Sequence, residues 1–463
     1  MKKLSLYLWF FFLTMPVFSQ DSLRLSLEEY LTWVQLNHPI SKQAAINLTM
    51  GRMEVRQARG GFDPLIYGNL DQKEFKSTEY YNNREAGIKI PTWMGVELNG
   101  TFEQNNGDFL NPERTVPNNG LIAAGASVNL GQGLILDERR AALRQAQIYE
   151  QATEVERQKM LNELYLDATD MYWRWALSFE NLRVLQEGLS LAEFRFRAVK
   201  RTFEQGDNAA IDTVEAYTQV LSRRYRLQTA ENNFFVATQM LNTFLWDESG
   251  SPMFLNQDIY PQGLFDEFLL APDQAELRSL VASHPELRLT DYELARLEVD
   301  RKLKTQQLLP VVKLKYNFIN ERFDGLTEYA FFENNYKWGV SVYSPIFLRK
   351  TRGAVGLANA KIDFKQNDRD LKELQLRNKL ESELNTWDIL NRQVNTIEEN
   401  VASLTRLLEG ETRRFQMGES SLFLVNAREV SVFDSRLTLN ELVSKLKISY
   451  AKTRVAAGLG FDD

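Results

Sequence analysis

The sequence predicts a mainly α-helical protein with a smaller β component, built from two similar halves. The halves are visible in the only two histidines of the chain, His38 and His284. Each precedes a proline and lies 26 residues before another proline, Pro64 or Pro310. They are visible again in long stretches with an apolar residue every 3.5 positions, each preceded by short stretches with strict alternation. Self-similarity at a fixed spacing indicates a duplicated architecture, and the two periods indicate helices and strands.

Two later segments repeat at one common offset. Residues 140–143 recur as residues 352–355, and residues 201–207 recur as residues 413–419, in both cases 212 positions further on. We therefore expect the two halves to contain the same elements in the same order.

The N-terminal segment, residues 1–19, is typical of a secretory signal peptide. Lys2 and Lys3 precede an apolar core at residues 4–13, and small residues precede an expected cleavage site before Gln20. This core is too short to span a bilayer as a helix. Loss of the two lysines takes the formal charge from −7 to −9. An acidic chain is a poor partner for nucleic acid, and a chain without cysteine forms no disulfide or thiolate site.

The first half is expected to span residues 20–246. Its elements are two helices separated by Pro39, a strand region, a long helix and a further helix, at residues 25–60, 65–130, 137–205 and 208–246. In the strand region, apolar and polar residues alternate over 94–102 and again over 122–130. A stretch rich in Asn, Gly and Pro separates these two sets and is expected to be a loop.

The second half is expected to span residues 272–463, after a linker at 247–271. It repeats the plan with helices, a strand region, a long helix and a last helix, at residues 273–308, 311–345, 350–416 and 420–458. The first strand region has roughly twice the length of the second. Its surplus is interpreted as either an extra hairpin or an extracellular loop.

The long helices carry a coiled-coil pattern. In the first, apolar positions run from Leu161 to Phe203 in alternating steps of three and four, and only Ser178 in this seam is polar. In the second, two seam positions are charged, Glu383 and Glu411. A sustained period of 3.5 predicts left-handed packing against partner helices. About 69 residues at ~1.5 Å each give a helix on the order of 100 Å long.

The expected strands are too few for one chain to close a membrane barrel. Two strands in each half give four per chain, whereas bacterial membrane barrels need at least about eight. An open sheet edge is not tolerated in lipid, because its backbone groups have no water to bind. Strands of this kind in a membrane therefore require several chains to share one barrel, with the helices continuing it as a hollow conduit.

Taken together, these features resemble the TolC-type outer membrane efflux proteins. The resemblance covers nearly all of the mature chain and rests on the order and spacing of a few segments: Pro64-Leu65, the strand-to-helix joints at 134–140 and 346–352, and the turns at 203–207 and 415–419. It implies a homotrimer in the cell outer membrane, with a shared transmembrane β-barrel of 12 strands and a long coiled-coil α-helical barrel that extends into the periplasm.

The resemblance also implies a function and partners. Such proteins are passive exit ducts of tripartite efflux or type I secretion systems, without a cofactor. They dock to a periplasmic adaptor (membrane fusion) protein and an inner-membrane pump of the RND or ABC type, and contact outer membrane lipid. The cargo is a drug, a metal or a polypeptide, and the sequence leaves open which of these is exported.

By the same resemblance, helix-turn-helix tips close the tunnel and contact the adaptor. The residues that match the tips are Gln205, Gly206, Asp207, Met417, Gly418 and Glu419. Glycine suits a helix end, where the backbone commonly adopts a left-handed conformation. A role as plain helix caps is the alternative interpretation.

A candidate gate follows from a departure from the family pattern. Some members carry an acidic ring six and nine residues after the second tip glycine, where this chain has Leu424 and Ala427. Asp212 and Glu215 occupy those offsets after Gly206. They are expected either to form a gate together with Leu424, or to belong to a solvated helix face or be first-turn charges that favour the helix dipole.

Two other classes of protein compete with this interpretation. An enzyme is disfavoured, because the chain has no nucleophile elbow, His-Glu-x-x-His motif or phosphate loop, and the two histidines are placed by duplication. A periplasmic coiled-coil adaptor or scaffold would use the heptads equally well. It would need compact β-domains with cores of their own, whereas the strands here are few and directly flanked by helices.

Overall fold

The structure is a computed structural model that describes residues 24–206, 209–256, 258–266, 271–321 and 335–461. The signal peptide expected at residues 1–19 lies outside these ranges, as does Asp207. The chain divides into two compact units. We call them the helical unit, which comprises Met1–Lys42, Leu161–Leu277 and Leu380–Asp463, and the sheet unit, which comprises Gln43–Met160 and Arg278–Lys379.

Proline separates the first two helices, α1 at Leu27–Asn37 and α2 at Pro39–Arg59. Ser26 begins α1 with a capping box. Its hydroxyl accepts a hydrogen bond from the Glu29 N–H at 3.2 Å, and its own N–H donates to the Glu29 carboxylate at 3.0 Å. His38 adopts the extended backbone that a residue before proline favours, with φ −64° and ψ 139°, so α1 ends there.

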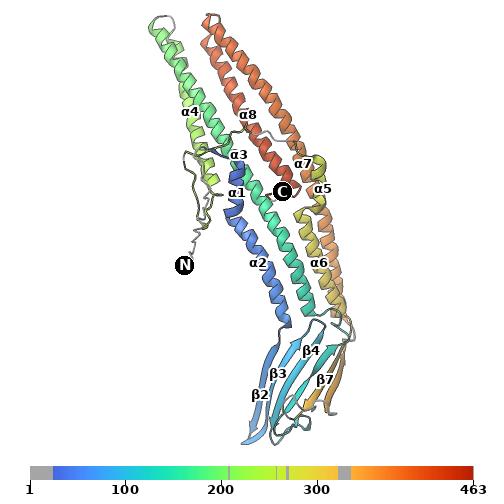
Figure 1. Cartoon of the computed structure of the whole chain (residues 1–463). Helices are drawn as coiled ribbons and strands as arrows, with labels where there is room; N and C mark the ends of the chain where they lie inside the picture. The colour runs from blue at the N-terminus through green and yellow to red at the C-terminus, as the bar shows by residue number, and fades with distance from the viewer. Residues whose placement is uncertain (1–23, 207–208, 257, 267–270, 322–334, 462–463) are drawn as a thin grey trace, which may run out of the picture. The chain divides into compact units, whose positions relative to one another are not determined.

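Four long helices form two hairpins. In the first, α3 at Glu138–Glu204 leads to α4 at Ala210–Asn242; in the second, α7 at Arg349–Gln416 leads to α8 at Leu422–Ala456 (Figure 1). The 67 residues of α3 and 68 of α7 make each helix about 100 Å long at ~1.5 Å per residue. Among the helices that the structure describes, none is apolar over a stretch long enough to cross a bilayer.

Apart from the main sheet, the remaining elements of the described ranges are two further helices, two short strands and three single turns. They are β1 at Arg24–Leu25, β6 at Tyr260–Pro261, α5 at Gln274–Leu280, α6 at Pro285–Gln306 and the single 3₁₀ turns η1 at Gly60–Phe62, η2 at Pro112–Arg114 and η3 at Val281–Ser283. β1 and β6 pair in parallel, so the segment between the halves is attached to the N-terminal end of the helical unit.

Aromatic residues of α3 form the centre of the helical unit. Tyr172, Trp173 and Trp175 are fully or almost fully buried and pack with Tyr30 of α1 and Leu241 of α4. The Tyr172 hydroxyl donates to the Leu25 carbonyl at 2.7 Å, so the polar end of this buried ring is satisfied. The predicted seam residues Leu164, Ala168 and Trp175 belong to the same cluster, so over this stretch the apolar seam of α3 forms a core inside a single chain.

One six-stranded antiparallel sheet lies in the sheet unit. Its strands are β2 at Leu65–Phe75, β3 at Thr78–Pro91, β4 at Val96–Asn106, β5 at Leu121–Asn129, β7 at Val311–Asn320 and β8 at Tyr336–Tyr343, in the order β2-β3-β4-β5-β7-β8 (Figure 1). The expectation of four strands per chain was wrong, because the first half contributes four and not two. Of the two interpretations of its surplus length, the extra hairpin is the one observed.

The missed strands carry a weak alternation. On β2 and β3, Gly68 and Ala86 occupy positions facing the same side as Ile66 and Ile88, so the apolar period is interrupted by residues with little side chain. A period-two pattern is detectable only where alternate side chains differ clearly in polarity. β4 meets that condition over more of its length, with Val96, Leu98 and Phe102 alternating with Glu97, Asn99 and Thr101.

Candidate functional site

The two hairpin tips end in the same local geometry. Gly206 follows α3 with φ +86°, and Gly418 follows α7 with φ +79°. A left-handed backbone at this place favours glycine, because a Cβ would crowd the following carbonyl. Both glycines are exposed, and a Cβ at either would meet no atom within 4 Å. The backbone conformation, and not lack of space, is therefore what calls for glycine at both tips.

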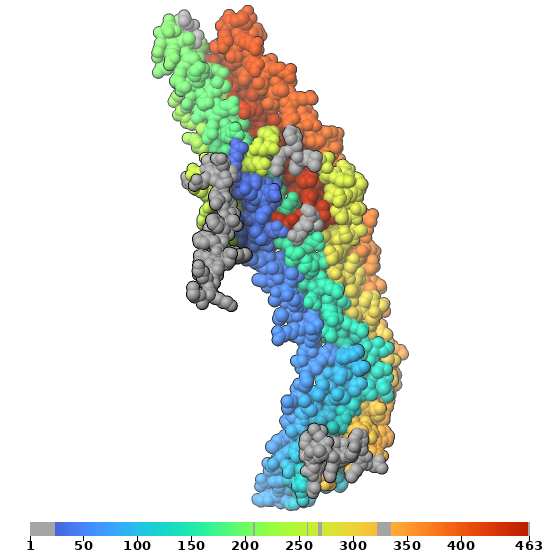
Figure 2. Space-filling view, viewed as in Figure 1, coloured from blue at the N-terminus to red at the C-terminus, as the bar shows by residue number. Residues whose placement is uncertain are grey.

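The tips pack against each other just behind their turns. Val199 of α3, Ala216 of α4 and Leu422 of α8 form a small buried cluster, against which Phe196 and Phe415 pack. All four long helices contribute to it. Figure 2 shows the two hairpin ends side by side at the surface, in green and in orange-red. The predicted tip residues Gln205, Met417 and Glu419 are exposed there, and Met417 has 65% of its surface accessible.

Behind this cluster lies a charged group that we call the tip network, made of Arg195, Glu215, Arg223, Asn426 and Glu429. Glu429 is only 1% exposed and accepts from Arg195 at 2.8 Å and from Arg223 at 2.7 Å. Asn426 accepts from Arg195 at 3.2 Å and donates to Glu215 at 3.1 Å. The network thus joins α3 and α4 of one hairpin to α8 of the other through buried, charge-assisted hydrogen bonds.

Burial and the neighbouring carboxylate shift the pKa of Arg223 in opposite directions. Desolvation lowers the pKa of its guanidinium below the ordinary value, although the nearby Glu429 carboxylate acts to raise it. The same side chain packs over the Phe433 ring, 4.8 Å from the ring centre. Arg223 remains charged at neutral pH, so the buried carboxylate keeps its counter-charges.

The candidate gate residues have different surroundings. Asp212 lies in the first turn of α4, half-buried, where its charge favours the helix dipole. Glu215 is held by Asn426 in the tip network. Leu424 lies in the first turn of α8, is 39% exposed, and donates its backbone N–H to the Ser421 hydroxyl. Within one chain, Glu215 is therefore joined to the opposite hairpin.

Sequence reasoning overlooked the tip network, although a signal for it exists. Leu422, Val425, Glu429 and Val432 follow one another on α8 in steps of three and four, so Glu429 is a charge in an apolar seam. Glu411 is likewise a charged residue in the apolar seam of α7. That residue is 7% exposed, accepts from the Ser420 hydroxyl and lies 4.0 Å from the Arg428 guanidinium.

The two histidines are structural in this fold. His38 stacks on Phe244 with ring centres 5.5 Å apart, and its Nδ1 accepts from the Ile40 N–H. His284 begins α6, and its Nδ1 accepts from the Glu286 N–H at 3.1 Å. Each ring therefore satisfies an N–H of the first helical turn, as a capping side chain does. Over the part of the chain that the structure describes, no group of three or more His, Asp or Glu side chains is arranged to hold a metal.

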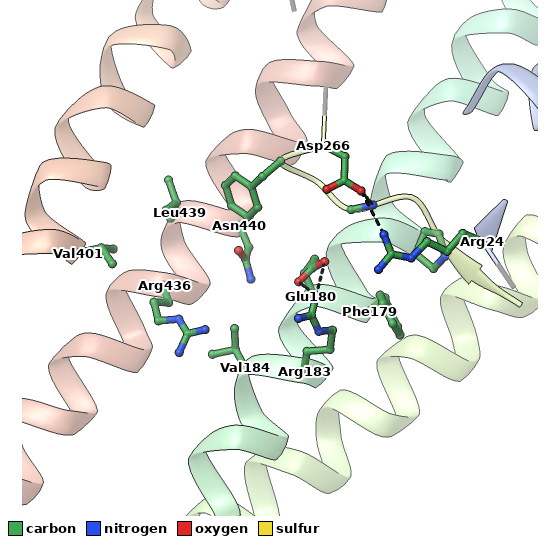
Figure 3. Close-up of a pocket in the computed structure, with 13 residues that line it drawn as sticks. Arg24, Phe179, Glu180, Arg183, Val184, Asp266, Val401, Arg436, Leu439 and Asn440 are labelled. Carbon is green, nitrogen blue, oxygen red and sulfur yellow. Dashed lines mark hydrogen bonds and ion pairs between the residues drawn. The ribbon is translucent and has the colours of Figure 1, made fainter. Parts of the chain in front are cut away.

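A charged cavity of about 330 Å³ lies in the helical unit (Figure 3). Arg24 pairs with Asp266 at 3.5 Å, and Arg183 pairs with Glu180 at 3.1 Å. Arg436, also at its wall, pairs with Glu187 at 2.8 Å. The charges around the cavity already neutralise one another, so it is a polar gap between helices and not a site with free binding groups.

Comparison with known families decides what this architecture is for. The family model of the outer membrane efflux proteins matches residues 95–245 and 277–459, which together make up well over half of the chain. The chain belongs to the outer membrane efflux protein family. The resemblance found in the sequence is thereby confirmed, and with it a location in the outer membrane with a periplasmic extension.

Solved structures of outer membrane channels share the family fold. The CmeC channel of Campylobacter jejuni matches with a TM-score of 0.66 at 14% identity, over 94% of this chain and 86% of that one. The OprN channel matches with a TM-score of 0.69 at 14% identity, over 94% and 90%. VceC of Vibrio cholerae matches with a TM-score of 0.67 at 14% identity, over 94% and 96%. No curated protein sequence matches the chain.

Membership of the efflux family also bears on the two rival classes. The family is one of transport ducts and not of enzymes. It gives no support to the periplasmic adaptor or scaffold alternative, and the matching solved structures are channels. The function of this outer membrane efflux protein is therefore to let solutes leave across the outer membrane.

Proposed function

We propose that three copies of the chain form the passive exit duct of a tripartite system, gated at the helix tips and docked there to a periplasmic adaptor. The observation that carries the gate is the tip geometry. Two exposed glycine turns end hairpins that are tied together by the tip network. Such turns present a small surface to a partner, while the network behind them transmits a displacement from one hairpin to the other.

The duplication and the trimer are part of this proposal. The family model matches two successive segments, in agreement with a duplicated chain. A lone copy exposes a broad apolar face of the sheet, including Ile66 at 79% and Val342 at 66%. An apolar face of this kind is stable against lipid, provided that the sheet closes on itself. Several copies around one axis satisfy both requirements.

The duct has no energy source of its own. An adaptor opens it by contacting the open tips better than the closed ones, since a ligand shifts a conformational equilibrium only by its difference in affinity for the two states. The adaptor brings an inner-membrane pump of the RND or ABC type, which selects the cargo. Asp212, Glu215 and Leu424 are proposed to line the narrowest part of the closed duct.

Replacement of both tip glycines tests this proposal. The double variant G206L/G418L forces leucine into a left-handed backbone, at about 1–2 kcal/mol for each residue. We expect it to assemble as a trimer but to lower export of a toxic compound, measured as drug resistance of cells that depend on this channel. G410L is the matched control, because Gly410 lies within α7 and a Cβ there meets nothing within 4 Å.

Resistance of the G206L/G418L cells equal to that of the G410L cells would remove the tips from the mechanism. The substitution M417E adds a second measurement without changing the backbone preference, since Met417 is exposed at the second tip. We expect it to weaken capture of the adaptor while the melting temperature of the trimer stays unchanged.

A further inference from the structure

The sheet has two strand edges whose backbone groups need partners. β2 and β8 are the outermost strands, and among the described residues each pairs on one side only. β2 has 11 residues and β8 has 8, lengths close to the ~9–11 residues of a strand that crosses a bilayer. Unpaired N–H and C=O groups within lipid are unfavourable by several kcal/mol each, so both edges must be covered there.

The two faces of the sheet are chemically distinct over most of their area, although Arg84 and Gln104 lie on the apolar face towards the β2–β3 turn. The strand registers place apolar residues on one face, including Ile66, Leu70, Ile88, Leu98, Phe102, Ile122, Val128, Leu314, Tyr316, Trp338, Val340 and Val342. They place polar residues on the other, including Asn69, Glu85, Lys89, Glu97, Asn99, Thr101, Ser127, Lys315, Asn317, Lys337 and Ser341. Both edge strands follow the same division, so a contact between them would continue each face without interruption.

The strand directions permit that contact. All five neighbouring pairs from β2 to β8 are antiparallel, so β2 and β8 run in opposite directions. β8 of one copy can therefore pair with β2 of the next in the same antiparallel manner as every other pair in the sheet. A barrel closed by this contact has no free strand edge. Because each copy contributes six strands, the barrel has an even number of strands for any number of copies.

We propose that β8 of each copy pairs with β2 of the next copy, so that three copies close a barrel of 18 strands and not of 12. The number follows from six strands in each of three chains, and the trimer on which it rests is that of the proposed function. The apolar face lies against lipid, and the polar face, with its lysines and glutamates, lines the interior of the duct.

The spacing of repeated residues indicates where the additional strands are inserted in the chain. His284 lies 246 positions after His38, whereas Arg352 lies 212 positions after Arg140. The first half is therefore longer than the second between these points, by the difference between the two offsets. β3, β4 and their turn occupy residues 78–106, within this stretch and between the strands β2 and β5. A sheet of four strands, with the hairpin of β3 and β4 inserted between β2 and β5, accounts for the six strands of this chain.

The additional strands enlarge the barrel. With neighbouring strands about 4.8 Å apart and a tilt of about 40°, 18 strands give a backbone diameter of about 36 Å, against about 24 Å for 12. A barrel of 16–18 strands leaves an aqueous channel, whereas about eight strands leave room for little more than their side chains. The membrane part of this duct is then wide enough to hold an aqueous channel.

Engineered cysteines test the contact between copies, and the chain is suited to them because it contains no cysteine of its own. The variant N69C on β2 is combined in turn with K337C, G339C or S341C on β8, three positions on the polar face that cover neighbouring registers. We expect one of these pairs to form disulfide-linked oligomers, up to a covalent trimer, on a non-reducing denaturing gel of purified outer membranes.

The matched alternative is a 12-stranded barrel in which β4, and not β2, meets β8 of the next copy. N99C on β4 replaces N69C for that purpose, with the same three partners on β8. Within one chain, β5 and β7 separate β4 from β8, so no intramolecular bond competes. Disulfide-linked oligomers from the N99C set would overturn the 18-stranded barrel and leave the trimer intact. The same holds if neither set forms such oligomers although the protein has the mass of a trimer.

The native mass of the detergent-solubilised protein separates the two proposals. A mass of one chain would refute the trimeric duct itself. A mass of three chains together with cross-linking of the N69C set supports both. Electron microscopy of the trimer in lipid nanodiscs, viewed along its axis, adds an independent readout. A backbone ring of about 36 Å supports the inference, and a ring of about 24 Å overturns it.

Discussion

At the residue scale, this chain places its buried polar groups at helix ends and between hairpins. Ser26, His38 and His284 each accept a backbone N–H in the first turn of a helix. Glu429 accepts from two arginines and is almost fully buried. A capping group is recognisable from the neighbouring sequence, whereas the arginine partners of Glu429 lie 206 and 234 positions away from it. The structural role of the histidines is therefore predictable from neighbouring residues, whereas the arginine partners of Glu429 are not.

The substitution E429Q tests the tip network. It removes the negative charge and leaves two largely buried guanidinium groups without their counter-charge, which destabilises a protein by about 3–5 kcal/mol. We expect the helical signal in circular dichroism to be lost at a clearly lower temperature. E441Q is the control, because the Glu441–Lys445 pair is more than half exposed on both sides and contributes at most about 0.5 kcal/mol. Equal melting temperatures for the two variants would contradict a structural role of the network.

At the scale of elements, the long helices and the strands differ in how far their sequence determines them. α3 and α7 are indicated by an apolar period maintained over many turns, and they end where Gly206 and Gly418 adopt positive φ. β2 and β3 have a weak alternation, so their membership of the sheet depends on the pairing of β2 with β3 and of β3 with β4. Long helices satisfy their backbone within themselves, whereas a strand does so only through its neighbours.

Two glycines within helices provide a matched test of element packing. At Gly51 of α2, a Cβ would lie 2.8 Å from the Thr153 hydroxyl and 3.1 Å from the Cα of Glu150, so α2 and α3 approach closely there. We expect G51A to lower the unfolding free energy by about 1–3 kcal/mol through overpacking. G410A should raise it by about 0.5–1 kcal/mol, because nothing obstructs that Cβ and alanine is the better helix former. Thermal unfolding that shifts both variants in the same direction would contradict the close approach.

At the scale of the whole molecule, the division of the sheet into two faces determines what surrounds it. Val340 and Ser341 are consecutive on β8, yet their partners, Leu314 and Lys313, lie on opposite faces. In the outer membrane, the apolar face needs lipid and the polar face needs water. The sheet is therefore the part of the chain that meets both.

A pair of arginine substitutions tests this orientation. In the proposed orientation, V340R places a charge against lipid, which is unfavourable by about 2–4 kcal/mol near the middle of a bilayer, whereas S341R adds a charge to the opposite, polar face. We expect V340R to reduce the amount of assembled protein in the outer membrane fraction severalfold, and S341R to leave it close to normal. The reverse order, measured on immunoblots of unheated membranes, would mean that the two faces had been exchanged.

The sequence by itself indicated the long helices, the glycine turns at the tips and the family. All of these depend on local periodicity or on fixed spacing, which short-range backbone preferences and amphipathic packing impose on nearby residues. Only the tertiary structure decided that the first half contributes four strands and that Glu429 joins the two hairpins. Strand pairing and the partner of a buried charge depend on segments far apart in the chain, and no local pattern specifies which of them meet.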